Sequence, residues 1–293
     1  MFEAKFQSFG EKTDPSKGKE RLKALRTELK QRKLDGFIIP RTDQHQNEYV
    51  PASEERLAWL TGFSGSAGVA VVLENKAALF VDGRYTLEAK AQIDETAFTV
   101  EHLVEMPPDE WIAKNLKASG NFGYDPLRTT IGGVEKLAKA CERANAKLVA
   151  AETNPVDTIW EGRPEAPLSP VVLHDIRFAG ESAAEKIKRL QGELGKEKLD
   201  AAVLSDPASV AWTFNIRGAD VTHTPLPLSW AIVPQEGKPS LFVDARKLSN
   251  EVRDTLSKVA NMQEPAEFDA ALAEIAKGKN IRLDQATAPK HLA

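Results

Sequence analysis

The stretch VAVVLENKAALFVD, residues 69–82, sets two apolar runs on either side of a short polar turn, which is typical of a β-hairpin. A second stretch of the same form, WAIVPQEGKPSLFVD, occupies residues 230–244. Phe80-Val81-Asp82 in the first stretch thus returns as Phe242-Val243-Asp244 in the second, 162 residues later. This recurrence predicts that the chain contains the same folding unit twice.

Two further short sequence matches, which we call anchors, flank the hairpin in the same order in both units. The tripeptide KLD at residues 33–35 recurs at residues 198–200, and NFGYD at residues 121–125 recurs as NIRLD at residues 280–284. An amphipathic helical pattern precedes the first strand in both copies. Hairpins mixed with crossover helices predict an α/β fold, in which a mixed sheet is flanked by helices.

The two units are joined by EGRPEAPLSP, residues 161–170, whose three prolines favour an extended linker. We therefore assign the first domain to residues 1–160 and the second to residues 161–293. The first unit continues beyond its last anchor through a helix, a strand and a short helix, whereas the second ends soon after Asp284. We expect the second domain to be incomplete at its C-terminus, with an edge strand at residues 281–283.

Helix ends are marked by capping residues. Ser53 is expected to cap the helix that follows it, Ser182 and Glu185 form a capping box, and Asp206 precedes a proline at the first helical position. The glycine-rich GFSGSAG, residues 62–68, fits a helix C-cap and a tight turn better than a phosphate loop, because it follows a helix and precedes a strand.

Composition argues against binding to nucleic acid and to membranes. The chain has 39 Lys and Arg against 43 Asp and Glu, a net charge of −4, so it shows no basic excess for phosphate contacts. Its apolar runs all fall short of a membrane span, and no apolar signal segment begins the chain. The single cysteine, Cys141, lies in an apolar pattern and predicts a buried thiol. These features predict a cytoplasmic protein.

A polar loop, RTDQHQNEY at residues 41–49, follows the first predicted strand. Ligands of open α/β sheets commonly bind at the carboxyl ends of the strands. Asp43, His45 and Glu48 are therefore candidates for contacts with substrate or with another domain. The alternative is that the loop only satisfies its own backbone polar groups.

Two other polar segments are candidates for the same kinds of contact. Arg84 and Tyr85 follow the first hairpin, where the alternative is a capping Asp82 with a surface arginine. Arg217, Asp220 and His223 lie in a long polar loop before the second hairpin. The histidines do not fall in a carboxylate pattern that would hold a pair of metal ions, so we predict no catalytic residue and no metal site in this chain.

Long motifs span nearly the whole chain, at residues 39–49, 56–68, 81–85, 156–164 and 212–221. Together these segments resemble the N-terminal domains of aminopeptidase P. The proline-rich TPLPL segment, residues 224–228, departs from the pattern expected in the second domain, which leaves the contacts of that loop open.

The resemblance is to cytosolic three-domain Xaa-Pro aminopeptidases, and it implies two tandem creatinase N-terminal domains, each with a ribonuclease H-like core. In that family a third domain carries two metal ions, typically manganese, and releases the N-terminal residue from peptides with proline in second position. By this resemblance, the chain is the non-catalytic N-terminal region of such a metallopeptidase. It would hold no cofactor itself, shape access for proline-containing peptides and support a homodimer.

Two alternatives stay open from the sequence. One is a stand-alone, catalytically inactive module that binds peptides or proteins, as catalytically dead relatives with a histone-chaperone role do. The other is a prolidase or creatinase relative, which the doubled N-terminal unit disfavours. The reading frame beyond Ala293 would distinguish the first alternative from the peptidase.

Overall fold

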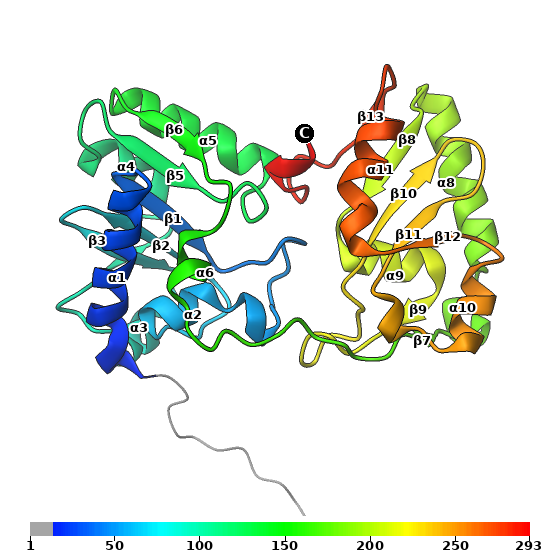
Figure 1. Cartoon of the computed structure of the whole chain (residues 1–293), viewed down its shortest axis with the longest axis horizontal. Coiled ribbons are helices and arrows are strands. Elements are labelled where there is room, and N and C mark those ends of the chain that lie inside the picture. The colour runs from blue at the N-terminus through cyan, green and yellow to red at the C-terminus, as the bar shows by residue number, and fades with distance from the viewer. Residues whose placement is uncertain (1–13) are drawn as a thin grey trace, which may run out of the picture. The chain divides into compact units, whose positions relative to one another are not determined.

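The structure is a computed structural model that describes residues 14–293, and its contacts divide the chain into two compact units (Figure 1). Neither unit is continuous in sequence. Of the described residues, the first unit consists of residues 14–41, Glu55–Asp125 and Leu137–Gly162, and the second consists of Thr42–Glu54, Pro126–Lys136 and Arg163–Ala293.

In the described part of the first unit, six strands form one mixed sheet in the order β4-β3-β2-β1-β5-β6. Strands β2 and β3 are the predicted hairpin, β1 runs antiparallel to β2, and the remaining neighbours are parallel. The strands are β1 (Gly36–Pro40), β2 (Gly68–Leu73), β3 (Ala77–Val81), β4 (Thr99–His102), β5 (Asn121–Tyr124) and β6 (Lys147–Ala150).

Helices cover both faces of this sheet. Helix α1 buries Leu22, Leu25 and Leu29 in the core that also contains alternate strand residues of one face, and α1 contacts α2 and α6. On the other face Phe80 meets Trp111 of α4 edge-on, with ring centroids 5.9 Å apart. The helical segments here are η1 (Pro15–Lys17), α1 (Gly18–Gln31), α2 (Arg56–Thr61), α3 (Thr86–Gln92), α4 (Pro108–Asn115), α6 (Pro155–Ile159) and the part of α5 (Ile131–Arg143) from Leu137 onward.

The main sheet of the second unit has the order β12-β11-β10-β8-β13, and a small antiparallel pair, β7-β9, lies apart from it. The strands are β7 (Val172–Leu173), β8 (Ala201–Leu204), β9 (Ile216–Arg217), β10 (Trp230–Pro234), β11 (Ser240–Phe242), β12 (Asn261–Gln263) and β13 (Ile281–Arg282). The helical segments are η2 (Ala52–Glu54), α7 (Ile176–Ala179), α8 (Ala183–Glu197), α9 (Pro207–Phe214), η3 (Ala245–Lys247), α10 (Asn250–Leu256), η4 (Pro265–Glu267), α11 (Phe268–Ile275) and η5 (Lys290–Leu292).

The two main sheets confirm the predicted repeat. Strands β8, β10, β11, β12 and β13 occupy the places of β1, β2, β3, β4 and β5, with the same parallel or antiparallel pairing at each step. In the described second sheet, β6 has no counterpart, so β13 pairs only with β8 and forms the sheet edge, as expected. The two sheets remain separate across the linker, where residues 161–170 contain neither helix nor strand.

Most of the predicted caps are confirmed, and one is wrong. Ser182 and Glu185 form the capping box of α8, Asp206 caps α9, and Gly62 ends α2 with a left-handed φ of 91°. Ser53, in contrast, lies inside η2, and α2 begins only at Arg56. The physical reason is that the adjacent Glu54 is held by two arginines, Arg128 at 2.9 Å and Arg163 at 2.9 Å, which fix residues 52–54 as a separate turn.

Within residues 14–293, none of the helices combines the length and the apolar character needed to cross a bilayer.

Candidate functional site

Asp43, in the loop after β1, belongs to the second unit and is 1% exposed. Its Oδ1 accepts hydrogen bonds from the backbone N–H groups of His45, at 2.9 Å, and Asn47, at 3.1 Å. Its Oδ2 accepts one from the Asn47 side chain at 2.7 Å. These contacts match the alternative in which the loop satisfies its own polar groups. A contact of Asp43 with substrate stays a prediction.

His45 is 2% exposed, and its Nδ1 lies 3.0 Å from the backbone carbonyl oxygen of Ser205. Because a carbonyl can only accept, Nδ1 carries the hydrogen, and in the neutral ring Nε2 is left as the acceptor. Burial lowers the pKa of His45, and this effect outweighs the opposing attraction of the Asp43 carboxylate. His45 is therefore a neutral, hydrogen-bonded residue at pH 7.

The His45 ring continues an aromatic cluster in the second unit. Its centroid lies 4.3 Å from that of Trp230, and Trp230 stacks on Phe268 with centroids 4.8 Å apart. Phe242 meets Phe268 edge-on at 5.1 Å. The ring thus contributes to packing, whereas Glu48, three residues further along the loop, is exposed.

Arg84 turns back onto the end of β3. Its backbone N–H donates to Asp82 Oδ1 at 2.9 Å, and its Nη2 donates to Oδ2 at 2.7 Å. The arginine hydrogen bonds lower the pKa of Asp82. The second repeat has the same arrangement, in which Asp244 accepts from the Arg246 backbone at 2.9 Å and from its side chain at 2.6 Å. The pair therefore belongs to the turn that both repeats share.

Tyr85 anchors the glycine-rich turn of the first unit. Its hydroxyl lies 3.0 Å from Ser66 Oγ, and its ring meets Phe63 edge-on at 5.5 Å. A Cβ on Gly65 would lie 2.3 Å from Phe63 Cζ and 2.8 Å from Tyr85 Cδ1, so only glycine fits there. The predicted structural interpretation of residues 62–68 is confirmed by this packing and by the C-cap at Gly62.

The loop of Arg217 and His223 is organised by a residue between them. Asp220 is 6% exposed and forms an ion pair with Lys247 Nζ at 2.6 Å. Its Oδ2 also accepts from the backbone N–H of Leu228 at 2.7 Å. Arg217 is half-buried in β9, and His223 is exposed at the tip with a φ of 61°. Sequence reasoning placed Asp220 in a polar loop but did not reveal its buried partner 27 residues away.

The described residues contain no group of three or more His, Cys, Asp or Glu side chains arranged to hold a metal ion. The loop of Asp43 and His45 does not fit such a role, because both Asp43 oxygens and His45 Nδ1 already have hydrogen-bond partners. We derive no metal chemistry from these residues.

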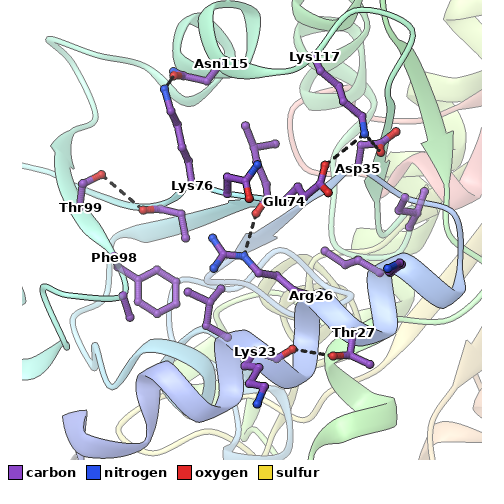
Figure 2. A pocket seen from close by; sticks show the side chains of 18 of the residues that line it. Lys23, Arg26, Thr27, Asp35, Glu74, Lys76, Phe98, Thr99, Asn115 and Lys117 are labelled. Atoms are coloured by element: carbon purple, nitrogen blue, oxygen red, sulfur yellow. Dashed lines mark hydrogen bonds and ion pairs between the residues drawn. The ribbon is translucent and has the colours of Figure 1, made fainter.

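A groove that the sequence reasoning missed lies in the first unit, with a volume of about 1200 Å³ (Figure 2). Helix α1 forms one wall, and the turn between β2 and β3, β4 with the segment before it, part of α4 and the segments before β1 and β5 form the rest. The sequence feature that could have revealed the groove is a cation at every third or fourth position of α1. The charged residues of the lining are Lys19, Lys23, Arg26, Lys30, Lys33, Asp35, Glu74, Lys76, Glu95, Glu101 and Lys117.

Both halves of the chain match the family described as the creatinase/prolidase N-terminal domain, at residues 21–159 and residues 162–293. A solved X-prolyl aminopeptidase from Caenorhabditis elegans, described as a cytosolic enzyme with a dinuclear active site, has a similar structure. It is 27% identical in sequence, with a TM-score of 0.88, and the match covers 94% of this chain and 48% of that one.

Curated relatives agree with this likeness. A probable Xaa-Pro aminopeptidase P of Coccidioides posadasii is 38% identical over 264 residues, which cover 89% of this chain and 40% of the relative. Aminopeptidase P1 of Arabidopsis thaliana is 34% identical over 258 residues, which cover 88% of this chain and 39% of the relative. The chain thus spans about 40% of the length of the curated relatives it matches. The resemblance to aminopeptidase P is confirmed, and the chain belongs to the creatinase/prolidase N-terminal domain family, with one such domain in each half.

Proposed function

We propose that this chain is the non-catalytic N-terminal region of a cytoplasmic Xaa-Pro aminopeptidase, a metallopeptidase that releases the first residue from peptides with proline second. The observation that carries the proposal is the extent of the match to the Coccidioides relative, which takes up 89% of this chain but only 40% of that protein. The peptidase chemistry would then reside in the part of such a protein that this chain does not align with, together with its two manganese ions.

The proposed role of the chain itself is to shape access for proline-containing peptides and to support a homodimer. Glu48, Arg84 and His223 are exposed and Arg217 is half-buried, so these side chains could meet a substrate or another domain. Asp43 and His45 would act by holding the loop that presents Glu48, since their own polar atoms are engaged within the unit.

The catalytic half of the proposal is tested by incubating the purified chain with Mn²⁺ and the peptide Arg-Pro-Pro, and measuring released arginine. We expect no turnover, because a two-metal hydrolase needs converging His, Asp and Glu ligands, and the described residues contain no group of three or more such side chains. Turnover that chelation abolishes, and that survives removal of contaminating peptidases, would contradict the proposal.

The reading frame beyond Ala293 tests the assignment to a peptidase. In-frame metal ligands, two Asp, one His and two Glu, would support the aminopeptidase, whereas a natural stop codon would favour the stand-alone binding module. Light scattering coupled to size-exclusion chromatography of the whole gene product tests the dimer. A homodimer requires a measured mass twice that of one chain. A monomer at all concentrations would remove dimer assembly from the proposed role.

A further inference from the structure

We propose that the groove of the first unit binds an extended, carboxylate-rich polypeptide segment along helix α1. This binding would be independent of the proposed function. Four cations of α1 are three or four residues apart, and side chains at this spacing share one face of a helix. A fifth cation, Lys33, lines the groove just beyond the end of α1. We call the set the cationic stripe, and all of its members line the groove. Figure 2 labels Lys23 and Arg26 among them. The cationic stripe consists of Lys19, Lys23, Arg26, Lys30 and Lys33.

The cations of the stripe are available to a ligand. Within residues 14–293, the side chains of its four lysines make no hydrogen bond or ion pair, and all four are exposed. Arg26 is half-buried, and its Nε donates to the carbonyl oxygen of Leu73 at 3.0 Å, which directs the guanidinium toward the groove (Figure 2). On the opposite wall Lys117 is already engaged by Asp35, at 2.7 Å, and Glu74, at 3.3 Å.

Helix stability does not account for the whole stripe. The helix dipole favours cations near the C-terminal end of α1, which suits Lys30 and Lys33, but it disfavours a cation in the first turn, where Lys19 lies. The chain also carries a net charge of −4, yet seven cations and four carboxylates line this groove. A local excess of positive charge on an acidic protein favours an acidic partner.

The length and charge pattern of the groove select an extended peptide. From Lys19 to Lys30 the helix rises about 17 Å, at about 1.5 Å per residue, and Lys33 follows just beyond the end of α1 at Gln31. Side chains on one side of an extended chain repeat about every 6.7 Å, so three or four carboxylates would span the stripe. The opposite side of such a peptide can present neutral or basic residues to Glu95 and Glu101. A nucleic acid is disfavoured, because its phosphates would lie close to the carboxylates of Glu95 and Glu101 and be repelled by them. A membrane is disfavoured as well, because a flat bilayer surface would not enter the groove.

The test measures the fluorescence anisotropy of a labelled peptide of six Glu-Thr repeats added to the whole chain. The matched peptide of six Gln-Thr repeats serves as the uncharged control. We expect the acidic peptide to bind, with an affinity that falls as salt is raised, and the Gln-Thr peptide not to bind. The double variant Lys23→Glu/Lys30→Glu should weaken binding at least about tenfold, because each reversal replaces an attraction by a repulsion.

The control protein is Lys90→Glu/Lys139→Glu, which changes the net charge equally at exposed lysines on α3 and α5 outside the groove. It should bind the acidic peptide as the unchanged protein does, and both variants should keep the same thermal midpoint. Equal losses of affinity in the two double variants, or no binding of the acidic peptide at low salt, would overturn the proposal. Tighter binding of a DNA duplex or of phosphatidylserine vesicles at the same sites would overturn the choice of a peptide.

Discussion

His45 couples the stability of the second unit to pH. Burial lowers its pKa in the folded chain, while in the unfolded chain the imidazole titrates near its ordinary value of about 6.5. Below that pH the unfolded chain takes up a proton that the folded unit excludes. The stability contributed by neutral His45 is therefore complete above about pH 6.5 and is lost as the pH falls toward the folded pKa. The charged groups that act on it are Asp43, Glu54 and Lys247.

We expect the free energy of unfolding to fall by up to about 1.4 kcal/mol per pH unit below pH 6.5 because of this one residue. Urea titrations followed by tryptophan fluorescence between pH 5 and pH 7.5 measure it. His45→Gln should flatten the slope, since glutamine can donate to the Ser205 carbonyl without titrating. His223→Gln, at an exposed position, should leave the slope unchanged. Equal slopes in all three proteins would show that His45 is not the coupled group.

The neighbouring cations Arg246 and Lys247 offer a second test at the scale of single residues. Lys247 pairs with Asp220 in a buried contact of 2.6 Å, whereas the side chain of Arg246 is 71% exposed in its pair with Asp244. Lys247→Met leaves a buried carboxylate without its cation and should cost about 3 kcal/mol. Arg246→Met should cost less than about 1 kcal/mol, because water screens the exposed pair. Chemical denaturation measures both, and similar costs would contradict the assigned burial.

Two glycines in different elements should respond to alanine with opposite signs. Gly65→Ala would place Cβ 2.3 Å from Phe63 Cζ in the turn before β2, and the overpacking should cost about 1–3 kcal/mol. Gly192 lies inside α8, and apart from its chain neighbours and the nearby backbone of its own helix nothing lies within 4 Å of the position that an added Cβ would take. Gly192→Ala should therefore stabilise the chain by up to about 1 kcal/mol. Thermal midpoints measure both changes, and a neutral Gly65→Ala would contradict the packing described for Tyr85.

Elements with a local cause could be predicted from the sequence. The hairpins follow from alternating apolar runs around short turns, and the capping box of Ser182 follows from hydroxyl and carboxylate chemistry three residues apart. The start of α2 was misplaced because the competing interaction is long-range, from Arg128 and Arg163 to Glu54. The buried roles of Asp220 and His45 likewise depend on partners far along the chain, which no local pattern reveals.

At the scale of the whole molecule, the second compact unit includes Thr42–Glu54 and Pro126–Lys136 in addition to Arg163–Ala293. A chain cut at the repeat boundary would therefore lack two segments of that unit, including the His45 ring that packs on Trp230. We expect residues 163–293 expressed alone to show faster amide hydrogen exchange in β8 and β10 than the same strands in the whole chain. Mass spectrometry of peptic fragments measures this. Equal protection in both samples would show that the two segments add nothing to the unit.

The turn shared by the repeats also constrains how each copy can change over time. Asp82 and Arg84 in one copy, and Asp244 and Arg246 in the other, form the same arrangement at the end of the hairpin. The residue that follows each arginine differs.

In the first copy it is Tyr85, whose hydroxyl meets Ser66, and in the second it is Lys247, whose ammonium meets Asp220. Exchanging only the tyrosine and the lysine would leave Asp220 without its cation and would bring an ammonium group to Ser66. In each copy, a substitution of the residue after the arginine is therefore tolerated only if its partner changes as well. Tyr85 and Ser66, and likewise Lys247 and Asp220, are expected to evolve as pairs.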